Sequence, residues 1–104
     1  MTRRQFLSLG FMPVRAGSIE VEVMEVFATS NGPSAVLIHH ANEAMRHTFS
    51  EWLHSNNGTP VICRSRNGVR IDGRLFRMKM CFGRGLIITN LPVTIRPREV
   101  LIVT

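Results

Sequence analysis

The chain has 104 residues, an apolar content of 44% and a formal net charge of +6. A chain of this length and composition predicts one domain that folds without metal or disulfide bonds, and it excludes a globally disordered protein. No apolar run reaches the roughly 18 residues of a membrane helix, and two cysteines make no disulfide framework, so we expect a cytoplasmic protein with reduced thiols and no membrane partner.

Basic residues gather in the second half of the sequence. Twelve of the thirteen are arginine, and seven lie between residues 60 and 85, where Asp72 is the single acid. In contrast, Glu20, Glu22 and Glu25 place three of the seven acids within six residues. This asymmetry predicts a field that attracts either nucleic acid or an acidic protein face. Alternatively, an arginine-rich surface serves solubility alone.

Residues 1–17 are predicted to form an arm or short strand ahead of a core over 18–104, the two making one domain. The opening TRRQFLSLG resembles a twin-arginine export signal. Such a signal continues as an apolar stretch of about 7–15 residues. Pro13 and Arg15 interrupt that stretch almost at once. We therefore expect an arm whose apolar side chains pack on the domain.

A β-hairpin is predicted over residues 18–40. Ile19, Val21 and Val23 alternate with glutamates, as in a strand with one buried face. The alternation fails over residues 24–27, which indicates a bulge. The turn residues SNGPS then precede AVLIHH, an apolar return strand.

The segment ANEAMRHTFSEWLHSNNG predicts a helix. Its apolar side chains recur on one stripe at about 100° per residue, and they are Ala41, Met45, Phe49, Trp52 and Leu53. Asn42 is predicted to be the N-cap, with Glu43 in the first turn. Asn57 and Gly58 form a left-handed stop, and Pro60 prevents continuation.

His40, Glu43 and His47 are spaced three and four residues apart, as zinc ligands on one helix face would be. That face lies opposite the apolar stripe, so the alternative is a solvated face with a Glu43–His47 pair. We prefer the alternative and predict neither a metal nor another cofactor.

The sequence TPVICRSRNGVRIDGRLF predicts a hairpin, and its apolar pattern discriminates between two possible registers. A three-residue loop at Arg66-Asn67-Gly68 pairs Cys63 with Ile71 and gives one apolar face, whereas a two-residue turn mixes arginine into that face. The longer loop also puts Gly68 at the left-handed position. Cys63 is therefore predicted to be a core thiol.

The remaining sequence reads as strands, over residues 69–82, 86–89, 93–96 and 100–103. The apolar phase changes after Leu75 to Phe76, Met78, Met80 and Phe82, which predicts a sharp bend near residues 73–76. Gly83-Arg84-Gly85 is interpreted as a tight turn. The alternative is that its backbone amides bind a phosphate. The order is an α+β fold: an N-terminal β-hairpin, one amphipathic helix, then a strongly bent antiparallel meander in a small open barrel.

The helix and hairpin over residues 49–75 resemble the Sm-like family, which includes bacterial Hfq. The positions that match are turn and core positions: Asn67, Gly68, Val69, Ile71, Gly73 and Leu75. The resemblance implies a small barrel more than it implies RNA binding. The Asp and Asn of the family's RNA-contacting loop have no counterpart in RMKMCFGRGLII, and IRPREV stands near the place of the Tyr-Lys-His segment of Hfq.

We predict a small basic binding module that contacts nucleic-acid phosphates, of RNA rather than DNA. The predicted contact residues lie on one arginine-bearing sheet surface: Arg64, Arg70, Arg74, Arg77, Lys79 and Arg84. Such contacts position a nucleic acid without reading its sequence.

Two alternatives belong to other classes. One is an oligomeric protein–protein module that uses the acidic hairpin against a basic patch. The other is a metal-dependent or toxin-type nuclease, although no catalytic constellation can be assembled from the residues. We therefore expect a binding protein, with homo-oligomers as an option, rather than an enzyme.

Overall fold

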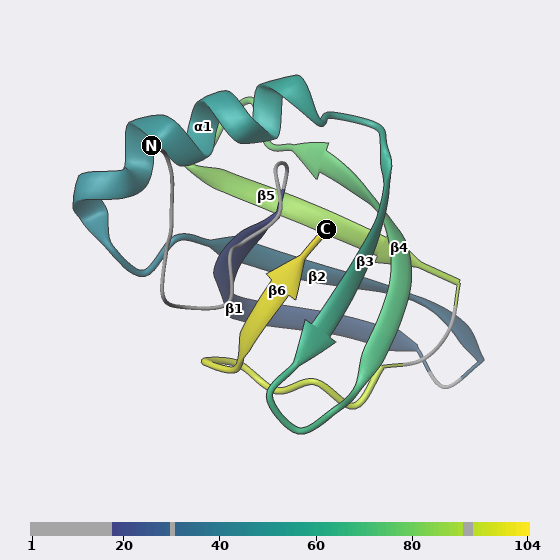
Figure 1. Cartoon of the computed structure of the whole chain (residues 1–104). Coiled ribbons are helices and arrows are strands. Elements are labelled where there is room, and N and C mark those ends of the chain that lie inside the picture. The colour runs from purple at the N-terminus through teal and green to yellow at the C-terminus, as the bar shows by residue number, and fades with distance from the viewer. Residues whose placement is uncertain (1–17, 30, 91–92) are drawn as a thin grey trace.

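The computed structural model of the chain describes residues 18–29, 31–90 and 93–104. The predicted arm over residues 1–17 lies outside the described residues. Within them, six antiparallel strands form a closed barrel in the order β1-β2-β5-β4-β3-β6, and one short helix lies against it (Figure 1). The predicted α+β order is confirmed, but the predicted open barrel is wrong, because the barrel closes.

The N-terminal hairpin is confirmed. β1 (Ile19–Thr29) pairs with β2 (Gly32–His39), and the register shifts between Val23 and Glu25, where the sequence loses its alternation. The shift keeps Val21 and Val23 in the core on one side of it and turns Glu25 outward beside Leu37 on the other. The bulge therefore preserves one buried face along a long strand.

The helix begins and ends near the predicted signals. A 3-10 turn (Glu43–Met45) leads into α1 (Arg46–Ser55), and the Asn42 side chain accepts a hydrogen bond from the Ala44 amide. Gly58 has a φ of 82°, the left-handed conformation predicted for the stop. Phe49 and Leu53 are buried and attach α1 to the barrel.

The predicted register of the central hairpin is confirmed. β3 (Pro60–Ser65) pairs with β4 (Arg70–Arg77), with Cys63 opposite Ile71. Gly68 has a φ of 85°. Cys63 is buried in the core as predicted, and burial, reinforced by the charge of Asp72, raises the pKa of its thiol to about 12.

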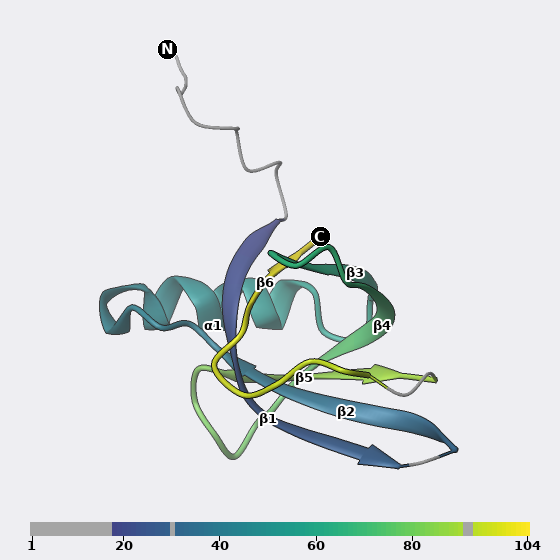
Figure 2. The same cartoon turned by 90° about the horizontal axis from the view of Figure 1, so that it is seen from below.

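The barrel closes through β6, whose position does not follow from a simple meander in which each strand pairs with the next one in the chain. β5 (Arg84–Thr89) lies between β4 and β2, and β6 (Val100–Val103) pairs with β1 on one edge and β3 on the other. Figure 2 shows β6 beside β3 on one side of the molecule, with β2 and β5 on the other. The edge strands of an open sheet expose unpaired backbone N–H and C=O groups. Here β6 forms hydrogen bonds with both β1 and β3, so neither of these strands is left as a free edge.

One predicted strand is wrong, and another is shorter than predicted. Residues 93–96 form no strand, although Ile95 is buried, and their chain continues to Arg98 and Glu99, which hydrogen-bond to the backbone of Val23. The strand predicted over 69–82 ends at Arg77, so a loop spans residues 78–83. The apolar set after Leu75 is not buried, since Phe76, Met80 and Phe82 are exposed.

At Gly73, β4 lies very close to β5. A Cβ at this position would lie 2.7 Å from the carbonyl oxygen of Ile88, a distance that side chains do not tolerate. The glycine therefore permits the close approach of the two strands in a closed barrel.

Candidate functional site

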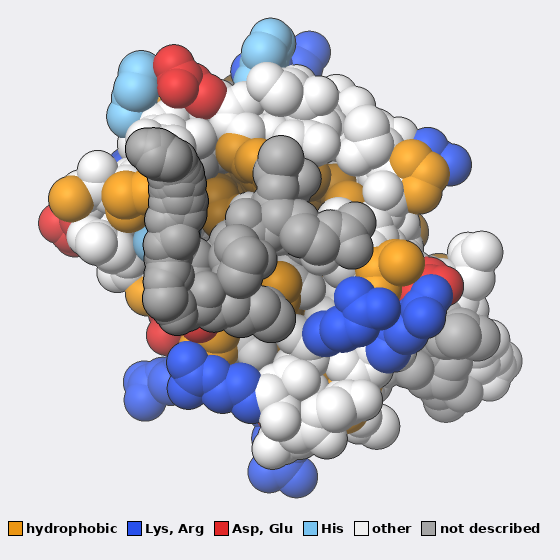
Figure 3. Space-filling model, viewed as in Figure 1, with side chains coloured by type: hydrophobic (Ala, Val, Ile, Leu, Met, Phe, Trp, Pro, Cys, Tyr) orange, Lys and Arg blue, Asp and Glu red, His pale blue; other side chains and the backbone are white. Residues whose placement is uncertain are grey.

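The six predicted contact residues do not share one surface. Arg64, Arg70 and Arg74 lie on β3 and β4, whereas Arg77, Lys79 and Arg84 surround the loop between β4 and β5. Figure 3 likewise shows Lys and Arg side chains in separate groups across one face of the molecule. Two regions must therefore be considered in turn.

In the first region, Arg70 and Arg74 have protein partners. Arg70 is opposite Arg64 across the strands and makes two hydrogen bonds to Asp72, of 3.0 and 3.4 Å. The hydrogen bond to Arg70 is the main cause that lowers the pKa of Asp72, and the same bond raises the pKa of Arg70. Arg74 donates a hydrogen bond to the carbonyl of Gly58. Asp72 thus neutralises part of this region.

The second region contains a hollow of about 330 Å³. Its lining residues come from the end of β2, the first turn of α1 and the loop before β5. Four of its lining side chains are Arg or His, and the full lining is His39, His40, Arg46, Cys81, Phe82, Gly83 and Arg84. The lining includes no acid.

Arg46 lies directly against the loop. Gly83 has a φ of 76°, and a Cβ there would lie 2.9 Å from Cγ of Arg46. A glycine at this position therefore lets the loop turn and also leaves room for the arginine stem. The guanidinium of Arg46 lies 3.8 Å from Glu43 in a solvent-exposed pair.

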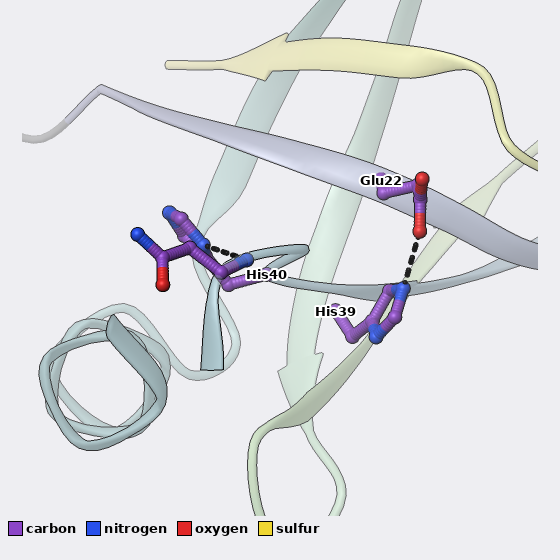
Figure 4. Close-up of polar contacts among 4 residues, drawn as sticks. Glu22, His39 and His40 are labelled. Carbon is purple, nitrogen blue, oxygen red and sulfur yellow. Dashed lines mark hydrogen bonds and ion pairs between the residues drawn. The ribbon is translucent and has the colours of Figure 1, made fainter. Parts of the chain in front are cut away.

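The two histidines of this hollow are oriented by different partners. His39 Nε2 lies 2.8 Å from Oε1 of Glu22, its cross-strand neighbour on β1 (Figure 4). The Nδ1 atom of His40 accepts a hydrogen bond of 3.1 Å from the amide of Asn42, and its ring meets Phe49 edge-on at 6.0 Å. Both imidazole rings are thus held in place near the N-terminal end of the helix.

Two more hollows continue from the first along α1. The second, of about 280 Å³, shares Phe82 and Gly83 with the first and adds Lys79 and Met78. The third, of about 510 Å³, shares Ser50 and Arg77 with the second. We call the three together the basic groove, whose charged and imidazole side chains are His39, His40, Arg46, Glu51, His54, Arg77, Lys79 and Arg84.

Arg77 lies between the second and third hollows. Its Nη1 donates to Nδ1 of His54 over 2.8 Å, and its amide donates to Oδ1 of Asn57 over 2.7 Å. Within the described part of the chain, its buried Nε and the buried hydroxyl of Ser50 have no hydrogen-bond partner. Both atoms belong to residues that line the groove.

Exposed apolar side chains stand beside the same cations. Phe82 is 64% exposed and Met80 is 94% exposed. Phe82 lines both the first and the second hollow. An exposed ring among arginines provides a face on which a nucleobase can stack.

Sequence reasoning identified only part of the groove. The sequence predicts Arg77, Lys79 and Arg84 as contact residues, whereas it gives Arg46, His39 and Phe82 no place in a ligand site. The turn at Gly83-Arg84-Gly85 is a signal in the sequence for this part of the groove, because phosphate binding by its amides is the alternative interpretation of that segment. Arg46 had no such signal, because it joins the groove only when the helix packs against the loop.

The metal candidates have separate contacts. Glu43 pairs with Arg46, and His47 pairs with Glu51 at 3.3 Å rather than with Glu43. Over residues 18–29, 31–90 and 93–104, no group of three or more His, Cys, Asp or Glu side chains is arranged to hold a metal ion. In the same residues, no helix has the length and apolar character to cross a membrane.

Comparison of the chain with protein-family models, with curated proteins and with solved structures finds no match. The resemblance of residues 49–75 to the Sm-like family stays a prediction.

Proposed function

We propose that the protein binds single-stranded nucleic acid, RNA rather than DNA, through phosphate contacts along the basic groove. The observation that carries this proposal is the continuity of the three hollows, because each hollow shares lining residues with the next. Their basic lining residues include Arg46, Arg77, Lys79 and Arg84. Glu51 is the one acid among their lining residues. A row of cations with one acid suits a polyanion.

The groove has the length for more than one nucleotide. It follows α1, whose ten residues span about 15 Å at 1.5 Å per residue. Arg46 and Arg84 lie at one end, and Arg77 with His54 lies at the other. Several phosphates of one strand can therefore be contacted in turn.

Phe82 supports a single strand over a duplex. Single-strand binding proteins combine a positive groove with aromatic side chains on which bases stack, and every base has a face to offer. Phe82 stands in the groove between Arg46 and Lys79 and is largely exposed. RNA is favoured because protein recognition of RNA targets mostly unstacked, single-stranded bases.

The test is fluorescence anisotropy with a labelled single-stranded RNA, the matching single-stranded DNA and a duplex of the same length, each at low and near-physiological salt. The proposal predicts micromolar or tighter binding of the RNA strand that weakens steeply with salt, because phosphate contacts release counterions. It also predicts weaker binding of the duplex. Absence of RNA binding at low salt would refute the proposal.

A further inference from the structure

A second surface of the barrel is apolar although it faces outward. The strand registers place six apolar side chains next to one another on the outer side of β1, β2, β5 and β4. Phe27, Ala35 and Ile88 form one row across the strands, and Leu37, Leu86 and Phe76 form the next. We call these six residues the outer apolar face.

The outer apolar face has no cover among the described elements. Phe27 is 52% exposed and Phe76 is 37% exposed, and the four side chains between them are half-buried. In Figure 2 the outer side of β2 and β5 turns away from α1, β3 and β6. Contiguous exposed apolar patches on a sheet mark interaction surfaces, whereas single exposed apolar residues are ordinary.

The two margins of this face carry opposite charges. Glu25 on β1 ends the row of Leu37, Leu86 and Phe76, and it is exposed. Arg74 on β4 ends the row of Phe27, Ala35 and Ile88 at the other margin. The hydrogen bond from Arg74 to Gly58 uses one of five guanidinium N–H groups, so donors remain for a carboxylate.

We propose that the outer apolar face binds a second copy of this chain in a two-fold dimer. In such an interface the same surface meets itself, so residues on one margin contact residues on the other. An axis parallel to the strands, midway between β2 and β5, brings β1 of one protomer over β4 of its partner. Glu25 of each protomer then lies over the β4 margin of the other at Phe76, two residues along the strand from Arg74, within reach of the long arginine side chain.

The composition of the face favours a second copy over nucleic acid. Its centre is aliphatic, formed by Ala35, Leu37, Leu86 and Ile88, and no aromatic ring lies there to stack a base. Homodimer interfaces have apolar centres and charged margins, as this face has. The basic groove does not include these six residues, so the dimer leaves the groove accessible.

Sedimentation velocity over a range of micromolar concentrations tests the dimer. The wild type is expected to dimerise, and Glu25→Arg or Arg74→Glu alone is expected to raise the dissociation constant about tenfold, because each places like charges together. The double variant Glu25→Arg/Arg74→Glu restores the pair and is expected to return most of the affinity. This rescue separates a contact across the interface from a general loss of structure.

Glu20→Arg is the matched control. It makes the same charge change on β1, but Glu20 pairs with Arg66 of its own chain at 3.4 Å and lies beyond the apolar rows. It should leave dimerisation unchanged. A protein that stays monomeric at the highest concentration overturns the proposal, as does a dimer that both reversals leave intact. A monomer whose RNA affinity falls in Phe27→Ala and Phe76→Ala overturns it as well and assigns the face to bases.

Discussion

Arg77 at the end of β4 donates a hydrogen bond to His54 in the last turn of α1, with 2.8 Å between Nη1 and Nδ1. The bond joins the helix to the barrel and fixes the guanidinium between two hollows of the basic groove. One residue therefore contributes both to the packing of α1 and to the charge of the groove.

Replacement of Arg77 by lysine separates these two contributions. Lysine keeps the charge, and the backbone hydrogen bond to Asn57 does not depend on the side chain, but lysine lacks the planar fork that reaches His54 together with a ligand. We expect Arg77→Lys to weaken RNA binding several-fold and Arg77→Ala to weaken it further. Arg64→Lys, outside the groove, should bind as the wild type does. Anisotropy titrations at one salt concentration measure all three.

Gly83→Ala tests whether the loop positions Arg46. Alanine at a φ of 76° is strained, and its Cβ would displace the Arg46 stem. Gly68→Ala is the matched control, because Gly68 has a φ of 85° and nothing within 4 Å of the added atom. Both variants should lose about 1–2 kcal/mol of unfolding free energy in urea.

The two glycine variants should differ in RNA affinity. Gly83→Ala should bind RNA several-fold more weakly than the wild type, whereas Gly68→Ala, corrected for its folded fraction, should not. Equal affinities for the two variants would show that the loop does not position Arg46 for binding.

Stability should fall at high pH because of Cys63. The unfolded thiol ionises near its ordinary value of 9.0, whereas the folded protein holds the proton to a pKa of about 12. Between these values the unfolded state binds fewer protons than the folded state, so the free energy of unfolding decreases as pH rises, by up to about 1.4 kcal/mol per pH unit. Below pH 9 this contribution is constant.

The control for this pH dependence is Cys63→Ala. The variant shares every other titrating group, so the difference between the two slopes of unfolding free energy against pH isolates the thiol. Parallel slopes between pH 9 and 11 would mean that Cys63 ionises without unfolding.

Thiol labelling gives a footprint of the groove. Cys81 lines the first hollow and is half-buried, whereas Cys63 is buried in the core. We expect iodoacetamide to modify Cys81 in the native protein well before Cys63, as peptide mass spectrometry can show. Saturating RNA should slow the modification of Cys81. An unchanged rate with RNA bound would place the ligand outside the first hollow.

Local signals in the sequence predicted local structure well. The register of β3 with β4 followed from one apolar face and the left-handed Gly68, and the helix followed from Asn42 and Gly58. These features depend on residues close together in the chain, so pattern and turn chemistry determine them.

Closure of the barrel could not be predicted in the same way. β6 inserts between β1 and β3, and its apolar residues would fit any strand buried on both faces. The segment over 93–96 has the same ambiguity: Ile95 is buried without being in a strand. Long-range pairing, not local preference, decides both.

The site was predicted only where residues are near in sequence. Arg77, Lys79 and Arg84 surround one loop, so charge density found them. Arg46 comes from α1, and it joins them through the packing of Leu53 on Gly85, where an added Cβ would lie 2.6 Å from the Leu53 side chain. No local sequence pattern predicts the contact between Leu53 and Gly85.

The central claim is that phosphates bind along the basic groove, and the salt dependence of RNA binding tests it most directly. Arg77→Ala/Arg84→Ala and Arg64→Ala/Arg70→Ala each remove two positive charges, from inside and outside the groove. The claim predicts that the first pair lowers the slope of log affinity against log salt by about 1.4, since each single-strand phosphate contact contributes about 0.7, and that the second leaves it unchanged. Equal losses in both pairs would contradict the claim, because net charge alone would then explain the binding.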